Sequence, residues 1–263
     1  MHDTSARPAP APLRLSRRLT QFAARPFTHF EIDDFVSSDF YHALDLAFPG
    51  AEQFAGGTAD GKRAFNSRSE SFGAFLNANP AWKMLCDAFC TPAFVTDVHA
   101  LCRRATIRTR GWRGLRPWVL ADRAPRGRLC RRFIQPVKVT FEFSRLPRGS
   151  WITPHTDGNS KLLSLMFYFP DEDWKAEWGG GTAYYAARND QARRKWSNWR
   201  NDHVSCEDID AFFADNATMR TVSFIANRLA GFVKSANSYH GVAPIECPAD
   251  RERRSLNINV VAA

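Results

Sequence analysis

Two side chains in the segment Thr153-Pro-His155-Thr-Asp157 have the types and spacing of metal ligands. If this segment is extended, the imidazole of His155 and the carboxylate of Asp157 point to the same side, because side chains in a strand repeat every two residues. Together they supply two of the three ligands of a simple metal site. We therefore expect the third ligand to come from a neighbouring strand that lies far along the sequence.

His240, in the segment Ser-Tyr-His-Gly-Val, is the candidate for this third ligand, and the segment Arg253-Arg-Ser255 follows it. Two histidines and one carboxylate occupy one face of an octahedral iron and leave three positions open. A bidentate 2-oxo acid can take two of these positions, and O₂ can take the third. A guanidinium deeper in the fold would then pair with the far carboxylate of that co-substrate, which arginine binds through a fork of donors. His203 is the rival for the third ligand.

These residues resemble the Fe(II)/2-oxoglutarate oxygenases, specifically their prolyl-4-hydroxylase-like branch. The resemblance continues between the ligands, where Lys161–Phe169 is similar to a strand of that branch that ends in tyrosine. Trp174 and the run Gly179-Gly-Gly-Thr182 are similar to its tryptophan and its Gly-Gly turn. The segment from Pro26 onward resembles the first strand of such enzymes, so the resemblance covers most of residues 26–261.

The resemblance implies roles for two sets of residues, which are the iron ligands (His155, Asp157 and His240) and the groups that bind the C5 carboxylate of 2-oxoglutarate (Arg253, supported by Ser255, and Tyr168). Arg254 is an alternative to Arg253, but only Arg253 shares a strand face with Ser255. The sequence departs from the branch at residues 144–146, where a tyrosine that contacts the co-substrate is common and Ser-Arg-Leu stands instead.

The activity that the resemblance implies is that of a 2-oxoglutarate/Fe(II)-dependent dioxygenase. It would hydroxylate an unactivated C–H bond, consume 2-oxoglutarate and O₂, and release succinate and CO₂, with ascorbate as a possible further requirement. The substrate would be a peptidyl or free amino acid, or an anionic or carrier-bound metabolite. A metalloenzyme that uses Zn²⁺ or Mn²⁺ in the same three ligands is the nearest alternative.

An arginine-rich segment, residues 101–132, contains eleven arginines and a single acidic residue. Most of the net charge of +9 is therefore local. A solvated loop is the simplest interpretation. However, guanidinium and indole groups can together bind phosphates and stack on bases or sugars. The alternative function is therefore a non-catalytic jelly-roll that binds nucleic acid or another polyanion through this segment, although nucleic acid is not the favoured partner. The predicted substrate contacts are Trp112, Arg113, Trp118 and Trp199.

The elements that must position these residues change in character near residue 136. Helical patterns occupy the chain before it, including one from residue 92 to about residue 103. Short apolar runs separated by turns follow it, with no helices between them, which is typical of an antiparallel sandwich or barrel. Together with the resemblance, this predicts an α+β, mainly β protein: a double-stranded β-helix (jelly-roll) core with N-terminal helices packed on the major sheet.

We expect one oxygenase domain preceded by a disordered tail. The predicted segments are the tail (1–25), a helical N-terminal half (26–135) that carries the arginine-rich loop (101–132), and the jelly-roll core (136–263) with a polar insertion (187–219). The insertion and the arginine-rich loop are the two candidates for a lid over the site.

The composition excludes several classes of protein. Hydrophobic residues make up 44% of the chain, which is enough for a core and excludes a disordered protein. The six cysteines contain no C-x-x-C pair, so we expect free thiols in the cytoplasm rather than a disulfide scaffold. No apolar run approaches the roughly 20 residues that cross a bilayer, so we expect no membrane span.

Overall fold

A computed structural model of the chain describes residues 13–54, 56–58, 60–125, 127, 132–200 and 205–263. The α-helices are α1 (Ser38–Leu46), α2 (Ser71–Ala78), α3 (Pro80–Phe89), α4 (Pro92–Arg110), α6 (Asp190–Lys195) and α7 (Cys206–Asp215). The strands are β1 (Gln21–Ala23), β2 (His29–Ile32), β3 (Arg63–Asn66), β4 (Trp118–Leu120), β5 (Gln135–Pro147), β6 (Ile152–His155), β7 (Lys161–Phe169), β8 (Thr182–Ala187), β9 (Asn216–Val222), β10 (Leu229–Val233), β11 (His240–Val242) and β12 (Glu252–Ala262).

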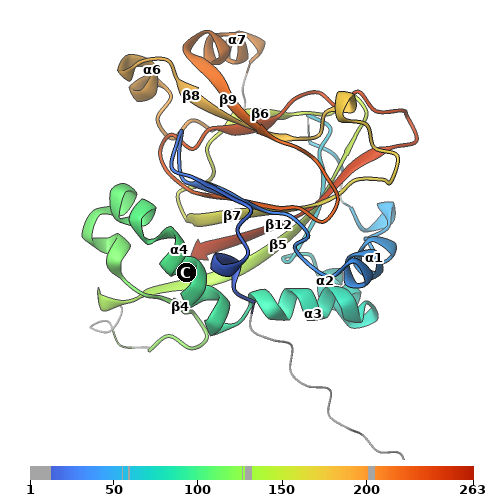
Figure 1. Cartoon of the computed structure of the whole chain (residues 1–263), viewed down its shortest axis with the longest axis horizontal. Coiled ribbons are helices and arrows are strands. Elements are labelled where there is room, and N and C mark those ends of the chain that lie inside the picture. The colour runs from blue at the N-terminus through green and yellow to red at the C-terminus, as the bar shows by residue number, and fades with distance from the viewer. Residues whose placement is uncertain (1–12, 55, 59, 126, 128–131, 201–204) are drawn as a thin grey trace, which may run out of the picture.

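The strands form two sheets that face each other as the walls of a jelly-roll (Figure 1). The major sheet has the antiparallel order β1-β2-β10-β7-β12-β5-β3, and β4 pairs with β5 in parallel. The minor sheet has the order β6-β11-β8-β9. Helices α1 to α4 lie against the outer face of the major sheet, whereas α6 and α7 lie beside the minor sheet (Figure 1). The predicted mainly β jelly-roll with N-terminal helices on the major sheet is confirmed.

Strand β12 shows how the period of two separates the core from the site. It lies between β5 and β7 and pairs with both along most of its length. Alternate residues pack under the helices (Leu256, Ile258 and Val260). The residues between them line the space enclosed by the two sheets (Arg253, Asn257 and Asn259). The outer face of the strand therefore holds the helices, and the inner face is free to carry polar side chains.

Phe143 of β5 lies at the centre of the core between the major sheet and the helices. Its side chain is fully buried. Its ring centroid is 4.7 Å from that of Trp82 on α3 and 5.3 Å from that of Phe48, and both pairs are edge-to-face. Each such pair contributes about 0.5–1.5 kcal/mol beyond the burial of its area. These aromatic contacts attach the helices to the sheet without using its inner face.

Helix α4 is longer than the sequence predicted. The expected helix ended near residue 103 and gave way to a loop over 101–132, whereas α4 continues to Arg110 and a 3-10 turn follows it. Arginine is a good helix former, and the buried face of α4 is mostly apolar, so its arginines can occupy the solvent side. Gly111 ends the helix with a φ of 57°, a left-handed value that glycine adopts readily.

The segment predicted as a tail is ordered where the structure describes it. Leu15 is fully buried in the core, and β1 pairs with β2. One leucine and one three-residue edge strand are too weak a pattern to recognise in a region rich in Ala, Pro and Arg. Residues 1–12 of the predicted tail lie outside the described residues. At the other end of the core, the predicted insertion overlaps β9, which already begins at Asn216.

Two further expectations concern cysteines and membrane spans. The cysteines that the structure describes are free thiols. Among the same described residues, no helix combines the length and the apolar character that crossing a membrane requires.

Replacing Phe143 with Ala should lower the free energy of unfolding by about 3–5 kcal/mol, because a fully buried ring at the centre of the aromatic cluster is lost. Chemical denaturation with urea measures this change. Phe22→Ala is the matched control, since this ring is 52% exposed and its loss should change stability by no more than about 0.5 kcal/mol. Equal effects of the two substitutions would contradict the described core.

Candidate metal and co-substrate site

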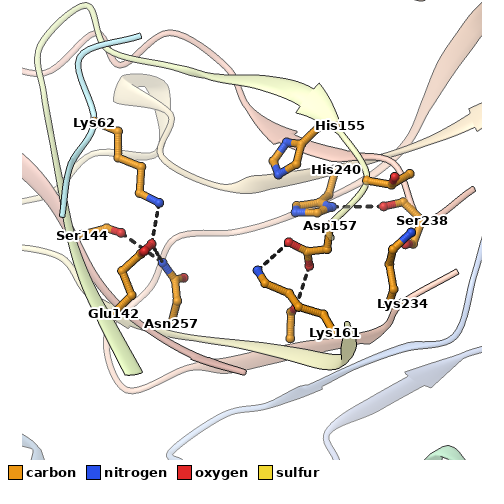
Figure 2. A network of polar contacts seen from close by, with 12 residues as sticks. Lys62, Glu142, Ser144, His155, Asp157, Lys161, Lys234, Ser238, His240 and Asn257 are labelled. Atoms are coloured by element: carbon orange, nitrogen blue, oxygen red, sulfur yellow. Dashed lines mark hydrogen bonds and ion pairs between the residues drawn. The ribbon is translucent and has the colours of Figure 1, made fainter. Parts of the chain in front are cut away.

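His155 and His240 are brought together by the pairing of two short strands. His155 is the last residue of β6, and His240 is the first residue of β11 and its direct partner in the antiparallel ladder. Their ring centroids are 4.4 Å apart. Asp157 lies just beyond the end of β6, and one ligand atom from each of the three side chains lies within 4.8 Å of the others. Figure 2 shows the three side chains converging on one point.

Backbone carbonyls determine which nitrogen of each imidazole is available. The Nδ1 atom of His155 lies 2.8 Å from the carbonyl oxygen of Thr153, and Nδ1 of His240 lies 3.0 Å from that of Ser238. A carbonyl can only accept, so each Nδ1 carries the proton and donates it. Each Nε2 atom therefore keeps its lone pair, which is the arrangement that metal-binding histidines use.

The protonation states of the three side chains suit a divalent cation. Burial, reinforced by the neighbouring His240, lowers the pKa of His155 to about 3. Burial also lowers the pKa of His240. For Asp157, burial opposes ionisation, but the ammonium of Lys161 outweighs it and holds the pKa of the carboxyl below its usual range. At neutral pH the site thus presents two neutral imidazoles and one carboxylate, all of them ready to bind a metal.

Both oxygens of Asp157 have partners on β7. The Nζ atom of Lys161 donates to Oδ1 at 2.5 Å, and Oγ of Ser164 donates to Oδ2 at 2.6 Å. The contact with Lys161 can be followed in Figure 2, and the two contacts together fix the orientation of the carboxylate. Neither residue was predicted from the sequence. The period of two places Ser164 on the inner face of β7, but many polar residues share that property, so the pattern alone does not single it out.

Arg253 lies in the same cavity as the three candidate ligands and is almost completely buried. Its Nε donates to the carbonyl of Gly180 at 2.6 Å, and Nη1 donates to Oγ of Ser255 at 3.0 Å. Its guanidinium also lies over the ring of Tyr168, at 5.3 Å from the centroid. No carboxylate of a described residue forms an ion pair with Arg253. It is a buried cation with neutral partners only, and such a group is costly unless an anion joins it.

Arg254 points to the other face of β12. Its guanidinium pairs with Asp45 at 3.0 Å and with Asp171 at 2.9 Å. The alternation of the strand therefore separates the two adjacent arginines: one faces the cavity, and the other holds the helical layer. Of the two sequence-based candidates, Arg253 is the one whose position suits a ligand inside the jelly-roll.

Tyr168 is fully buried on β7 beside Arg253. Its hydroxyl lies 2.7 Å from Oγ1 of Thr182, and either oxygen can be the donor. Burial raises the pKa of Tyr168, so it remains a neutral phenol that can donate a hydrogen bond. The phenol and the hydroxyl of Ser255 lie beside the guanidinium, and of these three residues Arg253 is the one that lines the cavity.

A single cavity of about 1030 Å³ contains the three candidate ligands and Arg253. It continues between the sheets toward β3, β5 and the loop that precedes β3. The residues that line this outer part are mostly polar (Thr58, Asp60, Lys62, Arg68, Thr140, Glu142, Trp151, Asn257 and Asn259). The volume is at the upper end of the range for small-molecule sites, so the cavity has room for a second molecule beside a co-substrate.

The four predicted substrate contacts do not line this cavity. Trp112 is 60% exposed, and Arg113 stacks over it on the surface. Trp118 is buried against His99, while Trp199 donates to the carbonyl of Pro154 and packs on a neighbouring tryptophan. Trp112 and Arg113 lie in the 3-10 turn that follows α4, Trp118 lies in β4, and Trp199 follows α6. A contact of these four residues with the substrate stays a prediction.

The arginine-rich segment contacts the backbone at the start of β7, next to the site. Arg110 donates from Nη2 to the carbonyls of Asn159 and Lys161, at 3.1 and 3.2 Å, where β7 begins. With Arg113, Arg116 and Gln135, it surrounds a separate cavity of about 220 Å³. The rival ligand His203 and the arginines at 126, 128 and 131 lie outside the described residues. The proposed binding of polyanions by this segment stays a prediction.

A family model described as the 2OG-Fe(II) oxygenase superfamily matches residues 141–261. This span includes His155, Asp157, His240 and Arg253. No curated protein sequence matches the chain.

Solved structures with a similar arrangement of the chain include a prolyl-4-hydroxylase from Pseudomonas putida, at 15% identity and a TM-score of 0.44, covering 89% of this chain and 92% of that one. A prolyl hydroxylase from Trichoplax adhaerens, solved with a hypoxia inducible factor peptide, has 13% identity and a TM-score of 0.49, with 89% and 83% covered. HygX from Streptomyces hygroscopicus, solved with nickel, 2-oxoglutarate and hygromycin B, has 11% identity and a TM-score of 0.47, with 89% and 83% covered.

Replacing Ser164 with Ala should weaken metal binding by about 10–100-fold, because Oδ2 of Asp157 loses the hydrogen bond that orients the carboxylate. Titration of the metal-free protein with Ni²⁺, followed by calorimetry, measures the affinity. Ser164→Thr is the matched control, since it retains the hydroxyl and should stay close to the wild type. Unchanged affinity in Ser164→Ala would show that this hydrogen bond does not orient the ligand.

Proposed function

We propose that this chain, whose residues 141–261 belong to the 2OG-Fe(II) oxygenase superfamily, hydroxylates an unactivated C–H bond and releases succinate and CO₂. Fe(II) and 2-oxoglutarate are the cofactor and co-substrate of this superfamily. In the proposal, His155, Asp157 and His240 hold the iron. Arg253, Ser255 and Tyr168 receive the C5 carboxylate of 2-oxoglutarate.

The observation that carries the proposal is that one cavity contains both a cluster of metal ligands and a buried cation without an anionic partner among the described residues. A cluster of two imidazoles and one carboxylate offers three ligand atoms within 4.8 Å, with lone pairs oriented inward. In the same cavity, the buried guanidinium of Arg253 has no carboxylate partner among the described residues. A metal ion suits the cluster and a dicarboxylate suits the cation, and 2-oxoglutarate spans both because its two ends differ in chemistry.

The residues of the chain bind and orient, and they exclude water. The donor set fits Fe(II), which accepts imidazole and carboxylate ligands on one face and leaves positions open. Bound iron and 2-oxoglutarate supply the activation of O₂ and the oxidation of the substrate. Arg253 fixes the far end of the co-substrate with charge-assisted hydrogen bonds, which the buried setting strengthens. The carbonyls of Thr153 and Ser238 keep the imidazoles in the tautomer that binds metal.

Anaerobic titration of the purified protein with Fe(II) and 2-oxoglutarate tests this proposal. The weak visible band that 2-oxoglutarate gives when it chelates iron should appear in the wild type. His155→Ala should abolish it, because two ligands hold Fe(II) too weakly. A wild-type protein that is loaded with iron and shows no such band would overturn the assignment.

Replacing Arg253 with Gln should weaken 2-oxoglutarate binding by about 10–100-fold, because the charge-assisted bonds to the C5 carboxylate are lost. The same visible band, followed against 2-oxoglutarate concentration, gives the dissociation constant. Arg254→Gln is the control. It removes the adjacent guanidinium on the opposite face and should lower stability through Asp45 and Asp171 while leaving 2-oxoglutarate affinity unchanged. The reverse pattern would assign the co-substrate to Arg254.

A further inference from the structure

Three polar side chains in the cavity have no part in the proposed binding of iron or 2-oxoglutarate. They are Glu142 on β5 and Asn257 and Asn259 on β12. In the antiparallel ladder, Asn257 is the direct partner of Glu142, and Asn259 is the partner of Thr140. Neighbouring strands are about 4.8 Å apart, so these side chains form one continuous polar patch on the inner face of the major sheet.

Asn259 lines the cavity with a side chain that has no hydrogen-bond partner among the described residues. The residue is 8% exposed, and its carboxamide makes no hydrogen bond with any described residue. It lines the cavity beside Ser164, its partner on β7 and the residue that orients Asp157. Because the side chain lines the cavity and is not engaged by the described part of the protein, its amide group is available to a molecule that binds there. A carboxamide offers both a donor and an acceptor to such a molecule.

Glu142 presents one carboxylate oxygen to the cavity. Its Oε1 accepts from Nζ of Lys62 at 2.5 Å and from Nδ2 of Asn257 at 3.4 Å (Figure 2). Its Oε2 accepts from no described residue. Burial disfavours the charged form, but Lys62 outweighs it and lowers the pKa of Glu142, so the group is a carboxylate at neutral pH. Because Lys62 balances its charge, the patch is neutral overall and contains donors and acceptors side by side.

We propose that Glu142, Asn257 and Asn259 form a subsite that binds adjacent hydroxyl groups of a neutral, sugar-like substrate. The inference rests on the proposed function and names the substrate class for it. A hydroxyl both donates and accepts, which matches a carboxylate beside two carboxamides. An ionised phosphate or carboxylate has no proton to donate to Oε2 of Glu142, whose charge Lys62 already balances. An apolar molecule would leave Asn259 unpaired.

Trp151 supports the same class of substrate from the mouth of the cavity. Its indole lines the cavity and remains 37% exposed, while its Nε1 donates to Oγ1 of Thr153. The hydrogen bond fixes the ring and leaves an aromatic surface available. A ring compound with hydroxyl groups has C–H faces that pack on an aromatic surface and edges that hydrogen-bond, so it can use the indole and the polar patch together.

The test measures succinate release by the Fe(II)-loaded protein with a panel of neutral monosaccharides and cyclitols. At least one member should raise the rate above the background turnover of 2-oxoglutarate. Glu142→Gln and Asn259→Ala should each lower kcat/KM for that compound by about 10–100-fold. The first replaces a charge-assisted hydrogen bond to the substrate with a neutral one, and the second removes a hydrogen bond. The affinity for 2-oxoglutarate, read from the visible band, should stay within about twofold and also reports that each variant is folded.

Asp87→Asn is the matched control. It removes the acidic half of another lysine pair, Lys83–Asp87, which lies on the surface of α3. It should leave kcat/KM unchanged.

Two results would overturn the subsite. One is stimulation by peptides or phosphorylated compounds and by no neutral polyol. The other is an equal loss of 2-oxoglutarate affinity in both cavity variants, which would place the patch in the co-substrate site. Absence of the visible band in the wild type would instead reject the proposed function.

Discussion

The alternation of side chains along β5, β7 and β12 is the constraint on which the rest of the structure depends. These three strands lie side by side in the major sheet, and each carries mainly apolar residues outward and most of its polar residues inward. The outward residues, with Phe143 at their centre, hold the helices. The inward residues form the floor of the cavity. A shift of register by one residue would exchange the two faces and bury charged groups under the helices.

The polar interior requires many hydrogen bonds, and the structure meets most of them within the protein. Asp157 is bonded through both oxygens, the imidazoles of His155 and His240 each donate to a carbonyl, and Tyr168 bonds to Thr182. Two side chains that line the cavity stand apart among the described residues, since Arg253 has no anionic partner and the carboxamide of Asn259 makes no hydrogen bond. The buried guanidinium of Arg253 lowers the stability of the folded protein unless an anion binds it, and Asn259 can bind a ligand without giving up a bond within the protein. Side chains whose bonding capacity the protein itself does not use indicate where a ligand binds.

The sequence predicted the chemistry of the site better than the path of the chain around it. The spacing of His155 and Asp157 restricts both side chains to one face, and the period of two favoured Arg253 over Arg254. By contrast, β6 and β11 are too short to be recognised from their pattern. The placement of α4 and its arginines depends on packing between distant segments, which local periodicity does not encode. Polar residues such as Glu142 and Asn259 look like the solvent face of a strand, and only the second sheet shows that they are enclosed.

The arginine-rich segment contributes to the site through contacts with the backbone. Arg110 binds the carbonyls of Asn159 and Lys161, and the side chain of Lys161 binds Asp157. The end of α4 therefore supports the start of β7, which in turn orients a candidate metal ligand. Arginine suits this role because its planar group can donate to two carbonyls at once. At this position the positive charge secures the backbone beneath the site, whereas the cavity itself recognises its substrate through a patch in which Lys62 balances Glu142.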